Sequence, residues 1–230
     1  MTDSGSASRR RVGGDTDEGD RGSSAILDLV TSVGAVLGVG VLLFAVSGVW
    51  PPLVAIESGS MEPNIDTGDL VFVMDEHRFV GDGAIAGTGV VTARQGADTG
   101  YTSFSGYGDV IVYRPNGNLD QTPIIHRAMF YVTEGENWYD RVDREYIGGD
   151  VGSCAQLEYC PAPHAGFITK GDANGQYDQT QPSLLSEPVK GDWVIATAEY
   201  RVPLIGWLRL QAGGGPLPWE TTTTAAGLAA

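Results

Sequence analysis

The chain has 230 residues, of which 42% are hydrophobic, enough for one ordinary domain with a buried core and some accessory sequence. It carries 29 acidic against 14 basic residues and a formal net charge of −15, which argues against nucleic acid as a partner because phosphate binding needs clustered Lys and Arg. The acidic residues are scattered, so we interpret them as a soluble acidic surface of the kind found in salt-loving organisms. The alternative is a surface for a specific basic partner.

The N-terminal segment, residues 1–24, is rich in Gly, Ser, Asp and Arg, a composition typical of disorder. It precedes an uncharged run from Leu29 to Trp50, whose 22 residues match the roughly 20 that a helix needs to cross a bilayer. We therefore predict one transmembrane helix over residues 25–50, ended by Pro51-Pro52. A cleavable signal peptide would have a shorter apolar core.

Four arginines precede the predicted span: Arg9, Arg10, Arg11 and Arg21. Lys and Arg accumulate on the cytoplasmic side of a membrane helix. The N-terminus is therefore predicted to be cytoplasmic, and everything from residue 51 onward external, in a single-pass protein of the cell membrane.

The predicted external domain, residues 51–210, contains short apolar runs separated by Gly, Pro, Asn and Asp. Their length and their β-branched and aromatic residues predict strands at LVFVM (70–74), DVIVYR (109–114), IIHRAMFYV (124–132), GFITKG (166–171) and DWVIATAEY (192–200). The domain is therefore predicted to be mainly β, with a sheet that is folded over or partly closed. Residues 201–211 are predicted to form a last strand or to lie on the bilayer, and residues 211–230 a flexible tail.

Residues 135–165 interrupt the strand pattern and are predicted to be a loop-rich insertion. The insertion holds both cysteines, Cys154 and Cys160, and in an external compartment we expect them to form a disulfide. Free thiols are the first alternative. A metal site with His164 is the second, but it would have too few ligands for a usual zinc site. We expect no metal and no cofactor.

Ser60 is a candidate nucleophile in the sequence Ser58-Gly59-Ser60-Met61-Glu62-Pro63, ten residues after the predicted span. Gly59 allows a sharp turn and Pro63 fixes the exit from it. Such a turn can expose a hydroxyl and point backbone N–H groups at one spot, as a serine nucleophile requires. By itself, however, a sequence of this kind usually forms only a turn.

A serine nucleophile also needs a base within hydrogen-bond reach. His77 lies in a charged segment, His164 in the Pro-rich insertion, and His126 in the apolar run IIHRAM. His126 is the best candidate, although a half-buried histidine on a strand is more often structural than catalytic. Asp172 and Asp178, in ITKGDANGQYD, either cap a turn or include the acid that orients His126.

In chain order, SGSMEP, GDVIVYRP, PIIHRA and FITKGDANGQYD resemble the motifs of type I signal peptidases, over most of residues 50–210. Histidine stands where the ordinary bacterial enzymes have a lysine base. The chain therefore resembles the archaeal and endoplasmic-reticulum branch, in which serine, histidine and aspartate carry the activity, and its acidity suggests a halophilic archaeon. The resemblance implies a signal-peptidase-like folded β-sheet catalytic domain with one N-terminal transmembrane helix.

Carried over to this sequence, the resemblance implies that Ser60 is the nucleophile and His126 the general base. Asp178 most resembles the orienting acid, and Asp172 resembles a second acidic residue needed in some relatives. Ser58 matches a position whose hydroxyl helps the backbone N–H of Ser60 to stabilise the oxyanion. The implied activity is removal of signal peptides from exported preproteins after small, Ala-x-Ala-like residues. The implied partners are those preproteins, the lipid bilayer and the export machinery.

The chain departs from the family pattern in the insertion and in showing no second apolar span after residue 50. Two other interpretations stay open. One is a Ser/Lys hydrolase, for which Lys170 and Lys190 are the available lysines. The other is a non-catalytic, membrane-tethered β domain that binds an external protein.

Overall fold

The structure is a computed structural model that describes residues 18–182 and 184–203. It contains two compact units, one up to Leu43 and one from Phe44 onward, and each is considered by itself. The predictions for residues 1–17 and for the tail over residues 211–230 lie outside the described residues, as does most of 201–211.

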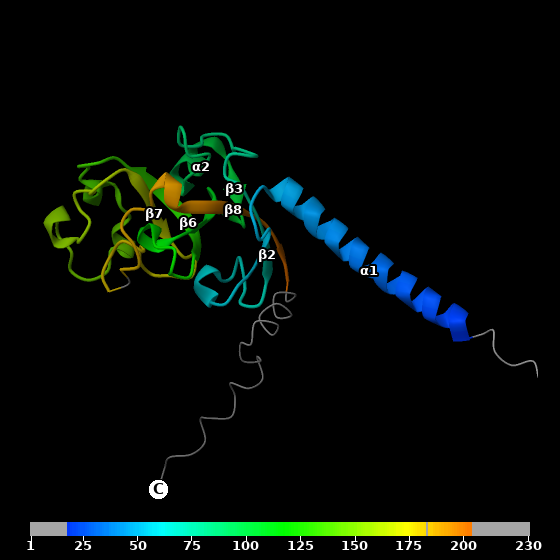
Figure 1. The fold of residues 1–230 in the computed structure, drawn as a ribbon. Coiled ribbons are helices and arrows are strands. Elements are labelled where there is room, and N and C mark those ends of the chain that lie inside the picture. The colour runs from blue at the N-terminus through cyan, green and yellow to red at the C-terminus, as the bar shows by residue number, and fades with distance from the viewer. Residues whose placement is uncertain (1–17, 183, 204–230) are drawn as a thin grey trace, which may run out of the picture. The chain divides into compact units, whose positions relative to one another are not determined.

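The first unit consists of most of helix α1 (Glu18–Ser47), the long blue helix of Figure 1. Its segment Ile26–Ser47 is long and apolar enough to cross a membrane. The helix begins at Glu18, before the predicted start at residue 25. Extending an existing helix by a turn or two costs far less free energy than nucleating one, and no proline interrupts this stretch.

The helix also ends before the predicted Trp50-Pro51 boundary. Gly48 has a φ of 80°, a left-handed conformation that stops a helix, and its N–H donates to Phe44 O at 2.8 Å. The last helical residue, Ser47, is fully buried and donates its hydroxyl to Val73 O at 2.8 Å. The final turn of α1 therefore belongs to the second unit, where it is attached to the end of strand β2 (Leu70–Met74).

The second unit is built on a six-stranded antiparallel sheet in the order β1-β2-β8-β5-β6-β7. Strands β2, β6, β7 and β8 of this sheet are labelled in Figure 1. The strands are β1 (Leu53–Ala55), β2 (Leu70–Met74), β5 (Val110–Tyr113), β6 (Ile124–Val132), β7 (Gly166–Lys170) and β8 (Val194–Val202). All five predicted strands are present, and the prediction of a mainly β domain with one N-terminal apolar helix is confirmed. Thr197 of β8 pairs with both Met74 and Ile111, so β8 joins the two halves of the sheet.

Smaller elements fill the connections. Helix α2 (Ala93–Thr99) was not predicted, because seven residues are too few to show a helical period. Its first turn is capped by the Thr92 hydroxyl, which accepts from Gln95 N, and Gly100 ends it in a left-handed conformation. A two-stranded hairpin follows, formed by β3 (Thr102–Ser103) and β4 (Gly106–Tyr107).

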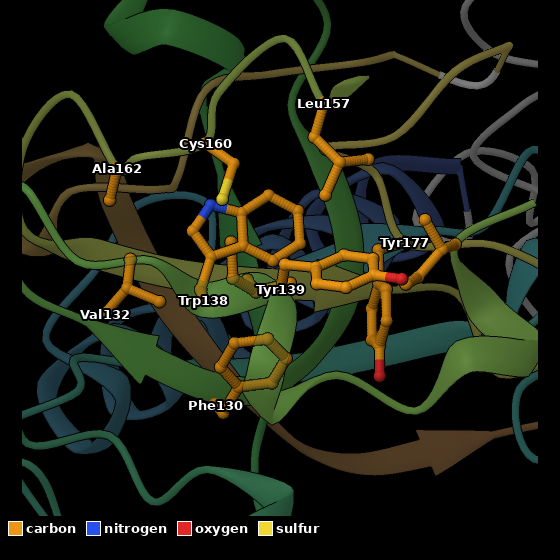
Figure 2. Packing of buried hydrophobic residues seen from close by; sticks show 10 residues of the cluster. Phe130, Val132, Trp138, Tyr139, Leu157, Cys160, Ala162 and Tyr177 are labelled. Atoms are coloured by element: carbon orange, nitrogen blue, oxygen red, sulfur yellow. The ribbon is translucent and has the colours of Figure 1, made fainter. Parts of the chain in front are cut away.

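The insertion over residues 135–165 has no strand and folds as three short 3-10 turns: η3 (Trp138–Arg141), η4 (Arg144–Tyr146) and η5 (Cys154–Gln156). It has its own apolar cluster, in which Trp138 is fully buried and packs near Phe130 of β6 (Figure 2). The indole N–H of Trp138 donates to Tyr159 O at 2.7 Å. Cys154 and Cys160 form a disulfide, which rules out free thiols and a thiolate metal site here. The predicted insertion is thus a packed lobe on the β6–β7 end of the sheet.

Candidate active site

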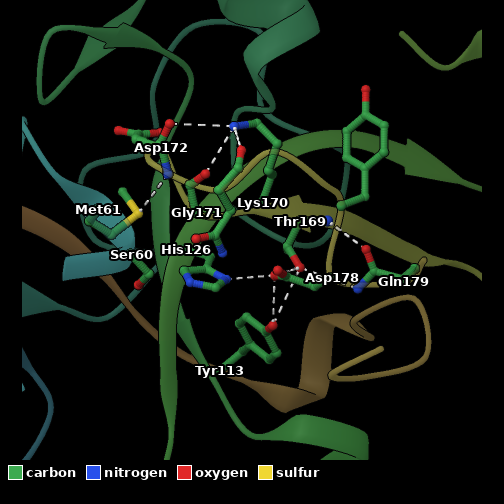
Figure 3. Close-up of polar contacts among 12 residues, drawn as sticks. Ser60, Met61, Tyr113, His126, Thr169, Lys170, Gly171, Asp172, Asp178 and Gln179 are labelled. Carbon is green, nitrogen blue, oxygen red and sulfur yellow. Dashed lines mark hydrogen bonds and ion pairs between the residues drawn. The ribbon is translucent and has the colours of Figure 1, made fainter. Parts of the chain in front are cut away.

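His126 and Asp178 form a buried pair at the centre of the candidate site (Figure 3). His126 lies on β6, opposite Ile111 of β5, and is 3% exposed. Asp178 follows the turn after β7, and its N–H donates to Thr169 O at 2.9 Å, which holds it against that strand. Its Oδ2 lies 2.7 Å from His126 Nδ1. The pairing of three neighbouring strands therefore brings together two residues far apart in the sequence.

Two hydroxyl groups reach the same carboxylate oxygen. The hydroxyl of Tyr113, on β5, donates to Asp178 Oδ2 at 3.0 Å, and Thr169 Oγ1, on β7, donates to it at 2.7 Å. Both side chains are fully buried. Burial, and after it the charge of Asp178, raises the pKa of Tyr113 well above its ordinary value, so its hydroxyl keeps its proton and can donate. Asp178 Oδ1 is buried and has no hydrogen-bond partner among the described residues.

Ser60 lies in a 3-10 turn, η1 (Gly59–Met61), which packs against β6. Its side chain is partly exposed, and its Oγ lies 3.3 Å from Ser58 Oγ. No hydrogen bond between the Ser60 hydroxyl and the imidazole of His126 is present in the described part of the chain. In the view of Figure 3 the imidazole lies between Asp178 and Ser60, with its second nitrogen on the side of Ser60.

The turn after β7 also holds the backbone of Ser60. The N–H of Ala173 donates to Ser60 O at 2.9 Å. Gly171 lies so close that a Cβ there would come within 2.5 Å of Ser60 O. The segment that carries Asp178 therefore also fixes the position of η1, and only glycine fits at the point of closest approach.

Asp172 has a different environment from Asp178. Its two carboxylate oxygens accept from Arg127 Nε at 2.8 Å and Arg127 Nη2 at 2.6 Å, a two-pronged pair that is largely buried. Asn64 Nδ2, just beyond η1, donates to Asp172 Oδ2 at 2.8 Å. The two aspartates that the sequence left undecided are thus separated: Asp178 contacts the histidine, and Asp172 links β6 to the segment after the serine.

The two lysines are engaged elsewhere. Lys170 Nζ donates to Gly171 O at 2.9 Å and Asn174 O at 2.8 Å, and lies 4.6 Å from the centre of the Tyr146 ring. Burial lowers the pKa of Lys170. Lys190 Nζ lies over the Trp193 ring at 4.9 Å. Neither lysine donates to Ser60 among the interactions of the described residues.

The other histidines also lie outside the candidate site. His164 Nε2 lies 2.9 Å from Glu187 Oε2, and His77 is exposed beside Asp75 and Glu76. These last three residues are the one group of possible metal ligands found among the described residues, and their loop contributes no residue to the His126–Asp178 pair. The candidate site itself thus offers a proton-transfer pair beside a hydroxyl.

An open hollow of about 690 Å³ adjoins the turn after β7. It is lined by Ala173, Asn174, Gly175, Gln176 and Leu185. Ala173 is the residue whose N–H holds the carbonyl of Ser60, so one end of the hollow begins next to the serine turn.

A scan against protein-family models gave no match for this chain, and a search of curated proteins found none similar to it in sequence.

Proposed function

We propose that this protein is a membrane-bound serine endopeptidase that removes N-terminal signal peptides from exported preproteins after small, Ala-x-Ala-like residues. The observation that carries the proposal is the buried contact of 2.7 Å between His126 Nδ1 and Asp178 Oδ2, because His126 lies on β6, the strand that packs against the turn of Ser60. A carboxylate bound to one imidazole nitrogen leaves the other free to act as a base. The motif resemblance to type I signal peptidases supplies the substrate class and the roles.

The proposed reaction is acyl transfer through the Ser60 hydroxyl. Ser60 Oγ, now 3.3 Å from Ser58 Oγ, turns towards His126 Nε2 when substrate binds. Nε2 takes the hydroxyl proton while Oγ bonds to the scissile carbonyl carbon. The imidazolium, stabilised by Asp178, then gives that proton to the leaving amine, and water releases the acyl group by the reverse sequence.

Two groups are proposed to stabilise the oxyanion: the backbone N–H of Ser60 and the hydroxyl of Ser58, which is freed when Ser60 turns. We also propose that the hollow beside Ala173 receives part of the extended preprotein chain, because it begins next to the serine turn.

The proposed location is the cell membrane, with the N-terminus cytoplasmic and the β domain external. The length and apolar character of Ile26–Ser47 support anchoring, and the arginines before the helix support this orientation. Such an anchor would keep Ser60 near the membrane surface, where the signal-peptide bond lies, and within reach of the export machinery.

Two alternatives are weaker on geometric grounds. A Ser/Lys hydrolase would use Lys170, but backbone carbonyls and the Tyr146 ring already surround its ammonium group. Burying the polar pair His126–Asp178 costs stability. A non-catalytic binding domain gives no reason for this cost beside Ser60.

The test is cleavage of a model preprotein by the purified full-length protein in detergent. Ser60→Ala and His126→Gln are expected to lower the rate by at least about 10⁴-fold. His164→Gln is the matched control, because it removes a histidine that is also bound to a carboxylate, and it should cleave at the parental rate. Cleavage by the Ser60→Ala variant would favour the binding domain. If the Lys170→Met variant lost cleavage while the His126→Gln variant kept it, the Ser/Lys hydrolase would be favoured.

The anchor has its own test. Two charges at Leu37→Asp/Val41→Asp should raise the free energy of membrane insertion by roughly 6 kcal/mol and release the protein from membranes at alkaline pH. Leu119→Asp, at an exposed leucine of the β domain, should stay in the membrane fraction with the parent. External protease should digest the β domain in intact spheroplasts. A protected β domain would overturn the orientation.

A further inference from the structure

A chain of hydrogen bonds runs from Gln179 through Thr169 to Asp178, and the donor and acceptor of each bond can be assigned starting from Gln179. This side chain is fully buried, and its Oε1 lies 2.9 Å from the backbone N of Thr169. Because a backbone N–H can only donate, the amide oxygen must face it. The amide nitrogen Nε2 then faces Thr169 Oγ1 at 3.2 Å and Glu187 O at 3.4 Å. Since the amide nitrogen Nε2 can donate hydrogen bonds but cannot accept one, Thr169 Oγ1 has to accept from it.

The hydroxyl of Thr169 therefore has its one hydrogen left for a different partner. The nearest acceptor is Asp178 Oδ2 at 2.7 Å, while the oxygen of Tyr113 is farther away at 3.4 Å. Tyr113 donates its own hydrogen to the same Oδ2 at 3.0 Å. Both hydroxyl hydrogens thus converge on the oxygen that His126 Nδ1 contacts (Figure 3).

We propose that Gln179, Thr169 and Tyr113 are positioning residues that select the tautomer of His126. Two hydroxyl hydrogens already point at Asp178 Oδ2, so this oxygen carries no hydrogen of its own and can only accept from the imidazole. This places the ring hydrogen on Nδ1 and leaves Nε2 without one. The inference about the tautomer stands on these contacts alone. Its effect on catalysis rests on the proposed function.

The direction matters because the other arrangement is unproductive. If the ring hydrogen were on Nε2, the imidazole could not take the proton of Ser60. The imidazole can place its hydrogen on either nitrogen, so the choice of tautomer has to come from neighbouring groups that can only donate or only accept a hydrogen bond. The backbone N–H of Thr169 is such a group.

The test uses the full-length chain in detergent micelles, with histidine labelled with ¹⁵N. The signals of His126 are identified by their absence in His126→Gln. The ¹⁵N shifts then report how much of the neutral ring carries its hydrogen on Nδ1. The variants are Tyr113→Phe, Thr169→Val and the two combined, with Thr169→Ser as the conservative exchange that keeps a hydroxyl. Tyr139→Phe is the matched control, since it removes a buried tyrosine hydroxyl bonded to Val151 O in the insertion.

We expect the Nδ1–H form to dominate in the parent, in Thr169→Ser and in Tyr139→Phe, and to lose population in the double variant. Tyr113→Phe and Thr169→Val should each lower kcat about tenfold with KM unchanged, the effect of one hydrogen bond on the transition state. Unchanged ¹⁵N shifts in the folded double variant would overturn the positioning roles. If the ¹⁵N shifts change in the double variant but the parent protein cleaves no preprotein, the positioning roles are supported and the proposed function is overturned.

Discussion

Asp172 and Asp178 show how one turn gives two carboxylates different tasks. Asp178 is 1% exposed, and its Oδ2 accepts from a tyrosine and a threonine and lies 2.7 Å from Nδ1 of His126. Asp172 accepts from Arg127 and Asn64 and has no hydrogen bond to His126. The first position is suited to holding a charge beside a base, and the second to holding two chain segments together.

This difference gives a paired prediction. Asp178→Asn keeps the shape but presents an amide to His126, which favours the wrong tautomer, so kcat should fall about 10⁴-fold with little change in stability. Asp172→Asn breaks a largely buried ion pair, so the free energy of unfolding should fall by about 3 kcal/mol. Preprotein cleavage and urea unfolding measure the two effects. The assignment is wrong if Asp178→Asn loses the stability and Asp172→Asn loses only kcat.

Gly171 gives a second prediction at this scale. A methyl group there would meet the backbone oxygen of Ser60 at 2.5 Å, and a backbone atom cannot move aside without shifting the whole serine turn. Gly171→Ala should therefore lower kcat about 100-fold, the usual effect of misplacing a reacting group by an ångström. Gly191→Ala is the control, because a methyl group at Gly191 meets only the methyl carbon of Thr88, at an ordinary contact distance of 3.5 Å. Equal activity of the two variants would contradict the contact.

At the scale of elements, the sequence predicts what depends on local pattern. The runs at 70–74 and 124–132 match β2 and β6 at both ends, because short β-branched stretches bounded by turn residues have few other ways to fold. The predicted end of α1 at the prolines is too late, because the left-handed backbone of Gly48 already ends the helix at Ser47. Helix α2 was missed because it is held by its caps rather than by a period.

The candidate site divides in the same way. Ser60, His126 and the two aspartates are visible in the sequence because each stands in a recognisable motif. Tyr113 and Thr169 lie within apolar strands, where they look like ordinary strand residues, and only the pairing of β5, β6 and β7 brings them to Asp178. Asp172 and Asp178 could not be distinguished, because their difference depends on the path of the turn and on Arg127.

The insertion offers a prediction about an element rather than a residue. The Cys154–Cys160 disulfide closes a short loop that packs on the Trp138 cluster. Removing it with Cys154→Ser/Cys160→Ser should lower the free energy of unfolding by about 2 kcal/mol, mainly by releasing the unfolded chain. Reductant should destabilise the parent by the same amount and leave the double variant unchanged. Two free thiols found by mass spectrometry of the untreated protein would contradict the disulfide.

At the scale of the whole molecule, the formal net charge of −15 is the dominant electrostatic feature. Twenty-nine acidic side chains are balanced by only 14 basic ones, so most acids have no cation of their own. Repulsion among them opposes folding, and dissolved salt weakens that repulsion because the screening length falls from about 10 Å at 0.1 M to about 3 Å at 1 M. Stability should therefore rise with salt concentration.

We predict that raising KCl from 0.1 M to 2 M increases Tm by roughly 5 °C, equivalent to about 2 kcal/mol for a chain of this size. A variant that neutralises four exposed acids, Asp98→Asn/Glu134→Gln/Asp150→Asn/Glu158→Gln, moves the formal net charge from −15 to −11 and should show a smaller increase. Sucrose stabilises folded proteins without screening charge, so it should raise Tm equally in both proteins. Equal responses of the two proteins to KCl would show that charge repulsion is not what salt relieves.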